Sequence, residues 1–264
     1  MRTNVLVLLT LACVSRVSSA QGERTPSARA GQDQRASMVR GDSLYDARNA
    51  SGALATYESV IAADPASYEA LWKAARSAID IGEFNHDETY RAALYEHARD
   101  FATRAVRANA ADAEGHFQLS RAVGKVALAA GVRDKVRLAE AVRIHALDAL
   151  ARKPDHDGAL HVIGVWNAEI RRLNGFERMM AKTFMGGQVL GEASWDAAVS
   201  YLQRAVAADP ARIVHRLDLG KVYLDVGKKQ LAREQFEWIA HAPIIDYNDS
   251  NYKRLAAEAL RGLR

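Results

Sequence analysis

The amino-acid sequence predicts an all-α protein built as an α-solenoid, a curved stack of helical hairpins. The chain has 264 residues and is 49% hydrophobic but only 7% aromatic, and its many alanines favour close-packed helices. Apolar residues recur at helical spacing, and no run alternates with period two over the length of a strand. Similar segments are separated by short links, several of them containing proline, which is typical of a repeat array and not of one closed globule.

The first 20 residues have the composition of a secretory signal peptide. Arg2 precedes an apolar run at residues 5–14, and small residues before position 21 suit cleavage near Ala20. This run is too short to cross a bilayer, which needs about 20 apolar residues. We therefore expect an exported protein, periplasmic or secreted. An uncleaved anchor and lipid attachment at Cys13 are the alternatives.

Charge and cysteine content argue against several classes of protein. The formal net charge is +4, from 36 basic and 32 acidic residues, and removal of the leader with its two arginines leaves 34 against 32, or +2. So balanced a charge argues against nucleic-acid binding. The one cysteine, Cys13, lies in the leader. The processed chain is therefore expected to have no disulfide and no thiol chemistry.

Five hairpins are predicted after a flexible linker at residues 21–33, which contain no apolar side chain larger than alanine. Proline ends a helix because it lacks the backbone N–H and restrains the residue before it. Pro65, Pro154 and Pro210 are therefore expected to end three units, and Ala110 occupies the same place once. The predicted units are 34–67, 68–112, 113–156, 157–212 and 213–246.

Two further segments accompany these units. An insertion at residues 173–192 lies inside the fourth unit, and its letters GFERMMAKTFM predict a short amphipathic helix. Ser194 is the expected N-cap of the helix that follows. Residues 249–264 place leucines and alanines at helical spacing. They are predicted to form a capping helix, since a terminal repeat would otherwise expose its apolar face.

The fifth unit carries the clearest packing pattern, LGKVYLDVGKKQLAREQF at residues 219–236. Small residues at Gly220 and Ala232 allow two helices to approach closely, while Tyr223 and Phe236 fill the space around them. This arrangement resembles the tetratricopeptide repeat. Such repeats bind other molecules, so the resemblance implies a binding scaffold.

Longer stretches narrow the resemblance. They are LWKAAR at 71–76, ALHVIGVWNAEI at 159–170, FERMMAKTFMGG, and SWDAAVSYLQRAVAADP leading into LGKVYL. In order and spacing they resemble the regulator of microtubule dynamics protein family over about residues 34–262. The resemblance implies a helical superhelix without enzymatic activity that serves protein association. Eukaryotic relatives include microtubule-associated and membrane-tethering proteins, and this sequence differs from them in its apparent export signal.

The concave face of the array is the expected binding surface, because the first helices of hairpins line it. Positions 5 and 9 of these helices share a face, and in repeats of this kind both point inward. The candidate residues there are Trp72, Arg76, Phe117, Arg121, His161 and Lys221. Aromatic anchors beside cations suit an extended or helical, acidic segment of a partner protein. The alternative is that the aromatic residues pack between hairpins and the arginine stems cover them.

The insertion offers a second candidate surface. Its basic and methionine residues are Arg171, Arg172, Arg178, Met179 and Lys182. They suit an acidic membrane surface or a partner helix, although a short insertion helix that packs its Met and Phe side chains onto the array and leaves its basic face in solvent is the better explanation. Our second functional hypothesis is therefore a carrier of lipid or another small apolar ligand, or a membrane-associated tether, that uses residues 173–192.

Catalytic and metal-binding motifs are not evident. His156 and His161 are five residues apart, which is not the i, i+4 pair of a zinc hydrolase. No Gly-rich phosphate loop and no nucleophile elbow occurs. Asp80 and Glu83 are assigned to a solvated acidic loop. We therefore expect no enzymatic activity, no cofactor, no metal site and no nucleic-acid partner. The primary hypothesis is a non-enzymatic protein–protein interaction scaffold.

Overall fold

The structure confirms the predicted all-α class. It is a computed structural model that describes residues 26–175, 177–179, 183 and 191–263, and no strand occurs among them. The helices with their bounds are α1 (Pro26–Asp46), α2 (Ala50–Ala63), α3 (Tyr68–Glu83), α4 (Glu88–Ala108), α5 (Ala113–Leu128), α6 (Val132–Arg152), α7 (Asp157–Arg172), α10 (Trp195–Ala208), α11 (Ile213–Asp225), α12 (Lys229–His241) and α13 (Asp249–Gly262).

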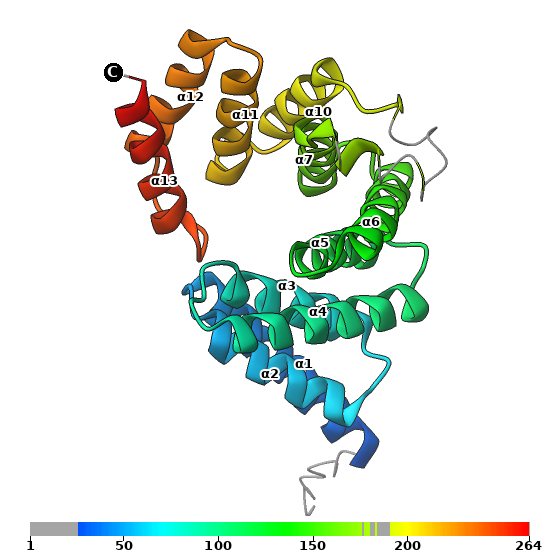
Figure 1. Ribbon diagram of the computed structural model, residues 1–264. Helices are drawn as coiled ribbons and strands as arrows, with labels where there is room; N and C mark the ends of the chain where they lie inside the picture. Colours follow the sequence, from blue (N-terminus) through cyan, green and yellow to red (C-terminus); the bar gives the residue numbers. More distant parts are fainter. Residues whose placement is uncertain (1–25, 176, 180–182, 184–190, 264) are drawn as a thin grey trace, which may run out of the picture.

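These helices form a curved array of hairpins (Figure 1). The pairs α1 and α2, α3 and α4, α5 and α6, α7 and α10, and α11 and α12 pack against each other, and each pair also packs against the next. The array bends so strongly that its last helix, α13, returns toward α3 (Figure 1). The concave side is thus a ring-like interior and not an open trough.

The start of the array differs from the expectation. Helix α1 begins at Pro26, so the linker predicted at residues 21–33 is wrong for residues 26–33, which are helical. Proline is well suited to a first helical position, where its missing N–H would have no partner within the helix. The remaining linker residues and the predicted signal peptide at 1–20 lie outside the described residues.

The links between hairpins repeat one local turn. Asp64, Asn109 and Asp209 each follow the last residue of a second helix, and each side-chain oxygen accepts the N–H two residues ahead at 3.1 Å. The residue between them is Pro65 or Pro210 in two of these links. This Asx turn and the proline together end the helix and direct the chain into the next unit. The helices therefore end where the sequence pattern predicted.

Within the hairpins, glycines of the first helix face large side chains of the second. A Cβ atom on Gly220 would lie 2.4 Å from Cε1 of Phe236, and one on Gly164 would lie 2.6 Å from Cγ of Leu202. The close approach predicted at Gly220 is present. The same arrangement recurs at Gly41 with Tyr57 and at Gly82 with Tyr95.

We expect Gly220→Ala to lower the free energy of unfolding by up to about 2 kcal/mol. Overpacking a core costs about 1–3 kcal/mol, and the gain in helix propensity offsets about 1 kcal/mol of it. Gly124→Ala is the matched control, because its Cβ would meet only Cγ2 of Val142 at 3.6 Å. That variant should be neutral or stabilised by up to about 1 kcal/mol in urea denaturation. Equal effects of the two changes would contradict this account of the hairpins.

Helix α13 covers the end of the array, as predicted. Its Tyr252 and Ala256 are buried against the last hairpin, and the capping positions Leu255, Leu260 and Leu263 are half-buried beside them. Ser194 also holds its predicted place, since its Oγ accepts the N–H of Ala197 at 3.0 Å.

The C-terminal segment additionally closes the array against α3. The side-chain amide of Asn248 donates to the carbonyl oxygen of Asp80 at 2.9 Å. The ring of Tyr252 meets the ring of Phe84 edge to face, with centroids 5.5 Å apart. Residues about 170 positions apart thus pair across the concave side. Among the helices that the structure describes, none combines the length and the apolar character needed to cross a membrane.

Candidate functional site

A cavity of about 590 Å³ occupies the concave side of the closed array. Its walls come from α3, α5, α6, α7 and α11, together with residues 246–252 of the closing segment. This volume falls within the range of about 300–1,000 Å³ that is usual for small-ligand pockets. The cavity is therefore the main candidate binding site among the described residues.

One wall of this cavity is apolar. Trp166 is held in place because its indole N–H donates to the carbonyl oxygen of Ala139 at 2.8 Å. Leu128, at the end of α5, lines the cavity while 70% exposed, so the apolar wall reaches solvent. Further apolar side chains on this wall are Ala127, Val142, Val162, Val165, Ile170 and Leu173. Because Leu173 begins the insertion, the apolar wall extends to that segment.

A second wall of the cavity is charged, and it includes the pair Arg121 and Asp80. A guanidinium N–H of Arg121 donates to Asp80 at 2.8 Å, and the hydroxyl of Tyr45 donates to the other carboxylate oxygen at 2.6 Å. Burial acts to lower the pKa of Arg121, but the charge and hydrogen bond of Asp80 together with the charge of Glu83 raise the pKa overall. Beside them Lys125 pairs with Glu83 at 2.9 Å. The cations of α5 are thus matched by acids of α3.

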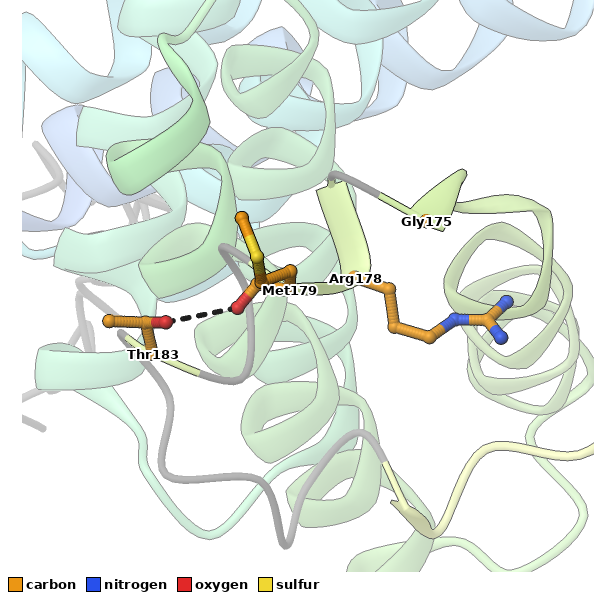
Figure 2. A pocket seen from close by; sticks show the side chains of 4 residues that line it. All are labelled: Gly175, Arg178, Met179 and Thr183. Carbon is orange, nitrogen blue, oxygen red and sulfur yellow. Dashed lines mark hydrogen bonds between the residues drawn. The ribbon is translucent and has the colours of Figure 1, made fainter.

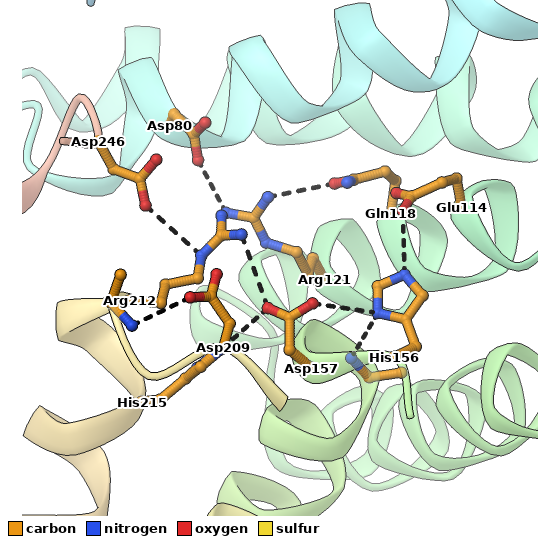
Figure 3. Close-up of polar contacts among 12 residues, drawn as sticks. Asp80, Glu114, Gln118, Arg121, His156, Asp157, Asp209, Arg212, His215 and Asp246 are labelled. Atoms are coloured by element: carbon orange, nitrogen blue, oxygen red, sulfur yellow. Dashed lines mark hydrogen bonds and ion pairs between the residues drawn. The ribbon is translucent and has the colours of Figure 1, made fainter. Parts of the chain in front are cut away.

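A second group of charges connects α7 to the closing segment (Figure 3). The carboxylate of Asp157 accepts from Nε2 of His215 at 2.9 Å and lies 3.7 Å from Arg212. Arg212 also lies 3.5 Å from Asp246. Burial acts to raise the pKa of Asp157, but the His215 hydrogen bond and the Arg212 charge lower it overall. Asp157 therefore stays ionised at the centre of this group.

A third group lies beside the cavity on α7 and α11. His161 Nε2 lies 2.9 Å from one oxygen of Asp218, and Lys221 Nζ donates to the other at 2.8 Å. Burial acts to raise the pKa of Asp218, but these two partners lower it overall. Asp218 is therefore an anion shared between two of the predicted groove residues.

The six predicted groove residues do not form one continuous surface. Phe117, Arg121 and His161 line the cavity, whereas Lys221 lies next to it on Asp218. Phe117 is nearly buried, with its ring centroid 4.6 Å from that of His156. It therefore packs between hairpins, as the alternative interpretation proposed.

Trp72 and Arg76 lie outside the cavity lining. The guanidinium of Arg76 is 3.5 Å from the ring centroid of Tyr45 and 5.3 Å from that of Trp72. Among the described residues, no carboxylate oxygen lies within 4.0 Å of a guanidinium nitrogen of Arg76, the distance limit for an ion pair. These two half-buried side chains thus form a cation–π stack against α1.

The main omission of the sequence analysis is the acidic half of the charged wall. Asp80 was assigned to a solvated loop, but it lies within α3 and is 8% exposed. Continuing the inward stripe from positions 5 and 9 to position 13 would have found it, because residues four apart share a helix face. That position holds Asp80, Lys125 and Glu169, and all three line the cavity.

The basic residues predicted at the insertion are described only in part, and two of the described ones have partners within the array. Arg172 pairs with Asp225 and with Glu169, each at 2.5 Å. Arg178 donates to the carbonyl oxygens of Arg171 and Leu173, at 3.3 and 3.2 Å. Two of the candidate cations are therefore already engaged by the array itself.

The remaining insertion candidates are solvent-facing where they are described. Arg171 is exposed, and Met179 is 55% exposed. Met179 lines an open hollow of about 410 Å³ with Gly175, Arg178 and Thr183 (Figure 2). Reciprocal hydrogen bonds between Asn174 and Glu177 form a capping box at the start of the insertion. In the insertion, the described residues 175, 177–179 and 183, which follow Asn174, are helical. Lys182 lies outside the described residues.

Comparison with known proteins was made at the level of sequence and of fold. The chain is 26% identical over 197 residues to regulator of microtubule dynamics protein 1 of Bos taurus, covering 74% of this chain and 61% of that protein. It is 23% identical over 184 residues to regulator of microtubule dynamics protein 3 of Bos taurus, covering 70% of this chain and 39% of that protein. The chain thus spans 61% of the length of the first of these relatives and 39% of the second.

Among solved structures, a thermophilic TPR protein of Thermus thermophilus superposes with a TM-score of 0.63 at 21% identity, covering 86% of this chain and 99% of that one. This similarity confirms the tetratricopeptide-like solenoid fold. The family model described as regulator of microtubule dynamics protein 1-3 matches residues 38–264. Because that match covers most of the 264 residues, the chain belongs to the regulator of microtubule dynamics protein 1-3 family.

Proposed function

We propose that this protein is a non-enzymatic interaction scaffold that holds a short segment of a partner protein in its central cavity. The observation that carries the proposal is the pairing of an apolar wall on α5, α6 and α7 with a charged wall on α3, α5 and α11 in one cavity. Such a site combines burial of apolar side chains with oriented polar contacts, which is the usual composition of a specific binding pocket.

The paired charges refine the expected partner. Arg121, Lys125 and Lys221 each have an internal carboxylate within 2.9 Å. A purely acidic guest would have to displace these acids, at a cost in desolvation and lost ion pairs. The favoured guest is therefore a segment with one or two large apolar side chains for the Trp166 wall and with polar groups of either sign beside them.

Filling the cavity tests this proposal. Gly124 lines the cavity, and a side chain there would meet only Val142 within 4 Å. We expect Gly124→Phe to fold, to occupy the apolar part of the cavity and to reduce recovery of partner proteins by tagged protein about tenfold or more, the loss of about 1.4 kcal/mol of binding free energy.

Gly31→Phe is the matched control, because Gly31 also lies inside a helix, with nothing within 4 Å of its Cβ position and outside the cavity lining. It should recover the same partners as the wild type. Equal recovery by wild type and Gly124→Phe would rule out the cavity as the site. Filling is a cleaner test than reversing the charge of Arg121, which would place a second acid beside Asp80.

A carrier of a small apolar or amphiphilic ligand is the second candidate. It is favoured by the size of the cavity and by the continuity of its apolar wall with Leu173 at the start of the insertion. A fluorescent fatty acid provides the probe. Saturable binding that is lost in Gly124→Phe and kept in Gly31→Phe would support the carrier. If Gly124→Phe recovers fewer partner proteins while the wild type does not bind the fluorescent fatty acid, the result supports the scaffold function and contradicts the carrier function.

We also propose that the chain is exported, because residues 1–20 have the composition of a signal peptide. Fractionation of cells that express the tagged full chain tests this. Retention in the cytoplasm would contradict export and would favour a role of the kind that the names of the relatives describe, in microtubule dynamics.

A further inference from the structure

A cluster of three potential metal ligands lies on the α5 and α6 hairpin, outside the central cavity. His116, His145 and Asp148 each offer one ligand atom, and these atoms all lie within 4.8 Å of one another. His145 and Asp148 are three residues apart on α6 and so share a helix face. His116 projects to them from the first turns of the antiparallel helix α5.

The spacing of the two imidazoles fits a tetrahedral metal ion. Nδ1 of His116 lies 3.3 Å from Nδ1 of His145. Two nitrogens bound to zinc at about 2.0–2.1 Å with tetrahedral geometry are separated by about 3.3–3.4 Å. Nδ1 of His116 is also 3.7 Å from Oδ2 of Asp148, so only a small side-chain shift brings the third ligand into place.

The surroundings orient the ligand atoms. Nε2 of His116 lies 3.3 Å from the carbonyl oxygen of Ala110. Because a carbonyl oxygen can only accept a hydrogen bond, Nε2 carries the proton of the neutral imidazole. Nδ1 therefore presents its lone pair to His145. Such a bond from the second imidazole nitrogen to a carbonyl is typical of metal-bound histidines. Arg152 pairs with Oδ1 of Asp148 at 3.3 Å, which leaves Oδ2 facing the histidines.

Access also suits an exchangeable ion with a water ligand. His116 is buried, whereas His145 and Asp148 are half-buried.

Without a metal, His145 donates one Nδ1–H bond to His116. On binding, that proton moves through solvent to Nε2 of His145, so that both Nδ1 atoms become ligands. The charge of Arg152 near His116 opposes a cation, and the carboxylate of Asp148 offsets it.

We propose that His116, His145 and Asp148 bind one Zn²⁺ ion, with water as the fourth ligand, and that this ion joins α5 to α6. The inference is independent of the proposed function, since none of the three residues lines the cavity. The sequence analysis predicted no metal site because His116 and His145 are 29 residues apart and meet only when the hairpin forms.

Titration of the untagged full chain with Zn²⁺ by calorimetry, with Mg²⁺ as the negative control, tests the site. We expect one Zn²⁺ per chain, a higher thermal midpoint with the ion, and visible absorption bands of tetrahedral Co²⁺ when Co²⁺ is the probe. His145→Gln and Asp148→Asn should weaken Zn²⁺ binding about tenfold or more, as loss of a ligand costs at least as much as loss of an outer-shell partner.

His97→Gln is the matched control, because His97 is an exposed histidine on α4 outside the cluster. It should bind Zn²⁺ like the wild type. Both test variants change half-buried residues and should fold, which their thermal midpoints without metal will verify. Absence of saturable Zn²⁺ binding by the wild type, or unchanged affinity in both cluster variants, would overturn the proposal.

Discussion

Arg121→Met is expected to lower the free energy of unfolding by about 3 kcal/mol. The change leaves Asp80 with a hydroxyl partner but no cation, and both side chains are mostly buried, at 17% exposed for Arg121 and 11% for Asp80. Removing one member of a buried ion pair costs about 3–5 kcal/mol, because the remaining charge is desolvated and unpaired. Since the carbonyl of Asp80 also holds Asn248, hydrogen exchange should rise in the closing segment.

Two comparisons make this result specific. Arg137→Met removes the exposed pair with Asp134, whose side chains are 76% and 62% exposed, and should cost less than about 0.5 kcal/mol. The double variant Arg121→Met with Asp80→Asn should recover most of the lost stability in urea denaturation, since it leaves no unpaired charge. A double variant no more stable than Arg121→Met would mean that packing and not charge explains the loss.

The stability of the protein should fall on mild acidification because of His215. This side chain is 1% exposed, and burial lowers its pKa from 6.5 to about 4. In the unfolded chain the His215 side chain binds a proton below about pH 6.5, whereas in the folded chain it does so only below about pH 4. The contribution of neutral His215 to the free energy of unfolding is therefore complete above pH 6.5 and is lost as the pH falls toward 4. Between pH 7.5 and 5 the loss is about 2 kcal/mol.

Charged and titratable groups from α7 and from the start of α11 surround His215. Asp157, on α7, accepts its hydrogen bond, His161 lies with its ring centroid 4.9 Å away, and Arg212 lies one turn earlier. His215→Gln retains an N–H donor but cannot titrate, so its loss of stability between pH 7.5 and 5 should be about 2 kcal/mol smaller than that of the wild type. His97→Gln should follow the wild type. Parallel pH profiles for the wild type and His215→Gln would disprove the role of His215.

Local features of the fold were predictable because they depend on neighbours in sequence. The turns after α2 and α10 follow from Asp64 with Pro65 and from Asp209 with Pro210, because the aspartate forms the same local hydrogen bond in both links. The start of α1 was not predictable in this way. Its first residues are polar and small, so they carry no apolar periodicity from which a helix could be inferred.

The candidate site was predictable only in part. The inward stripe predicted that Phe117, Arg121 and His161 face the concave side, because residues four apart share a helix face, and all three line the cavity. The charged pairs of the site were not predictable, since Asp80 and Arg121 are 41 residues apart in sequence and Asp157 and His215 are 58 apart. Pairs at such separation depend on how the hairpins stack, which no local pattern encodes.

From its sequence alone this protein could be assigned to a helical hairpin array, because helix periodicity, turn residues and small-to-large packing positions act over a few residues. The family was indicated separately, by the resemblance of particular sequence stretches in their order and spacing. Only the tertiary structure revealed that the array closes on itself and that its inner cations are already matched by acids. The reason is physical. Curvature accumulates over successive hairpin contacts, and the bond between Asn248 and Asp80 exists only after the whole array has turned.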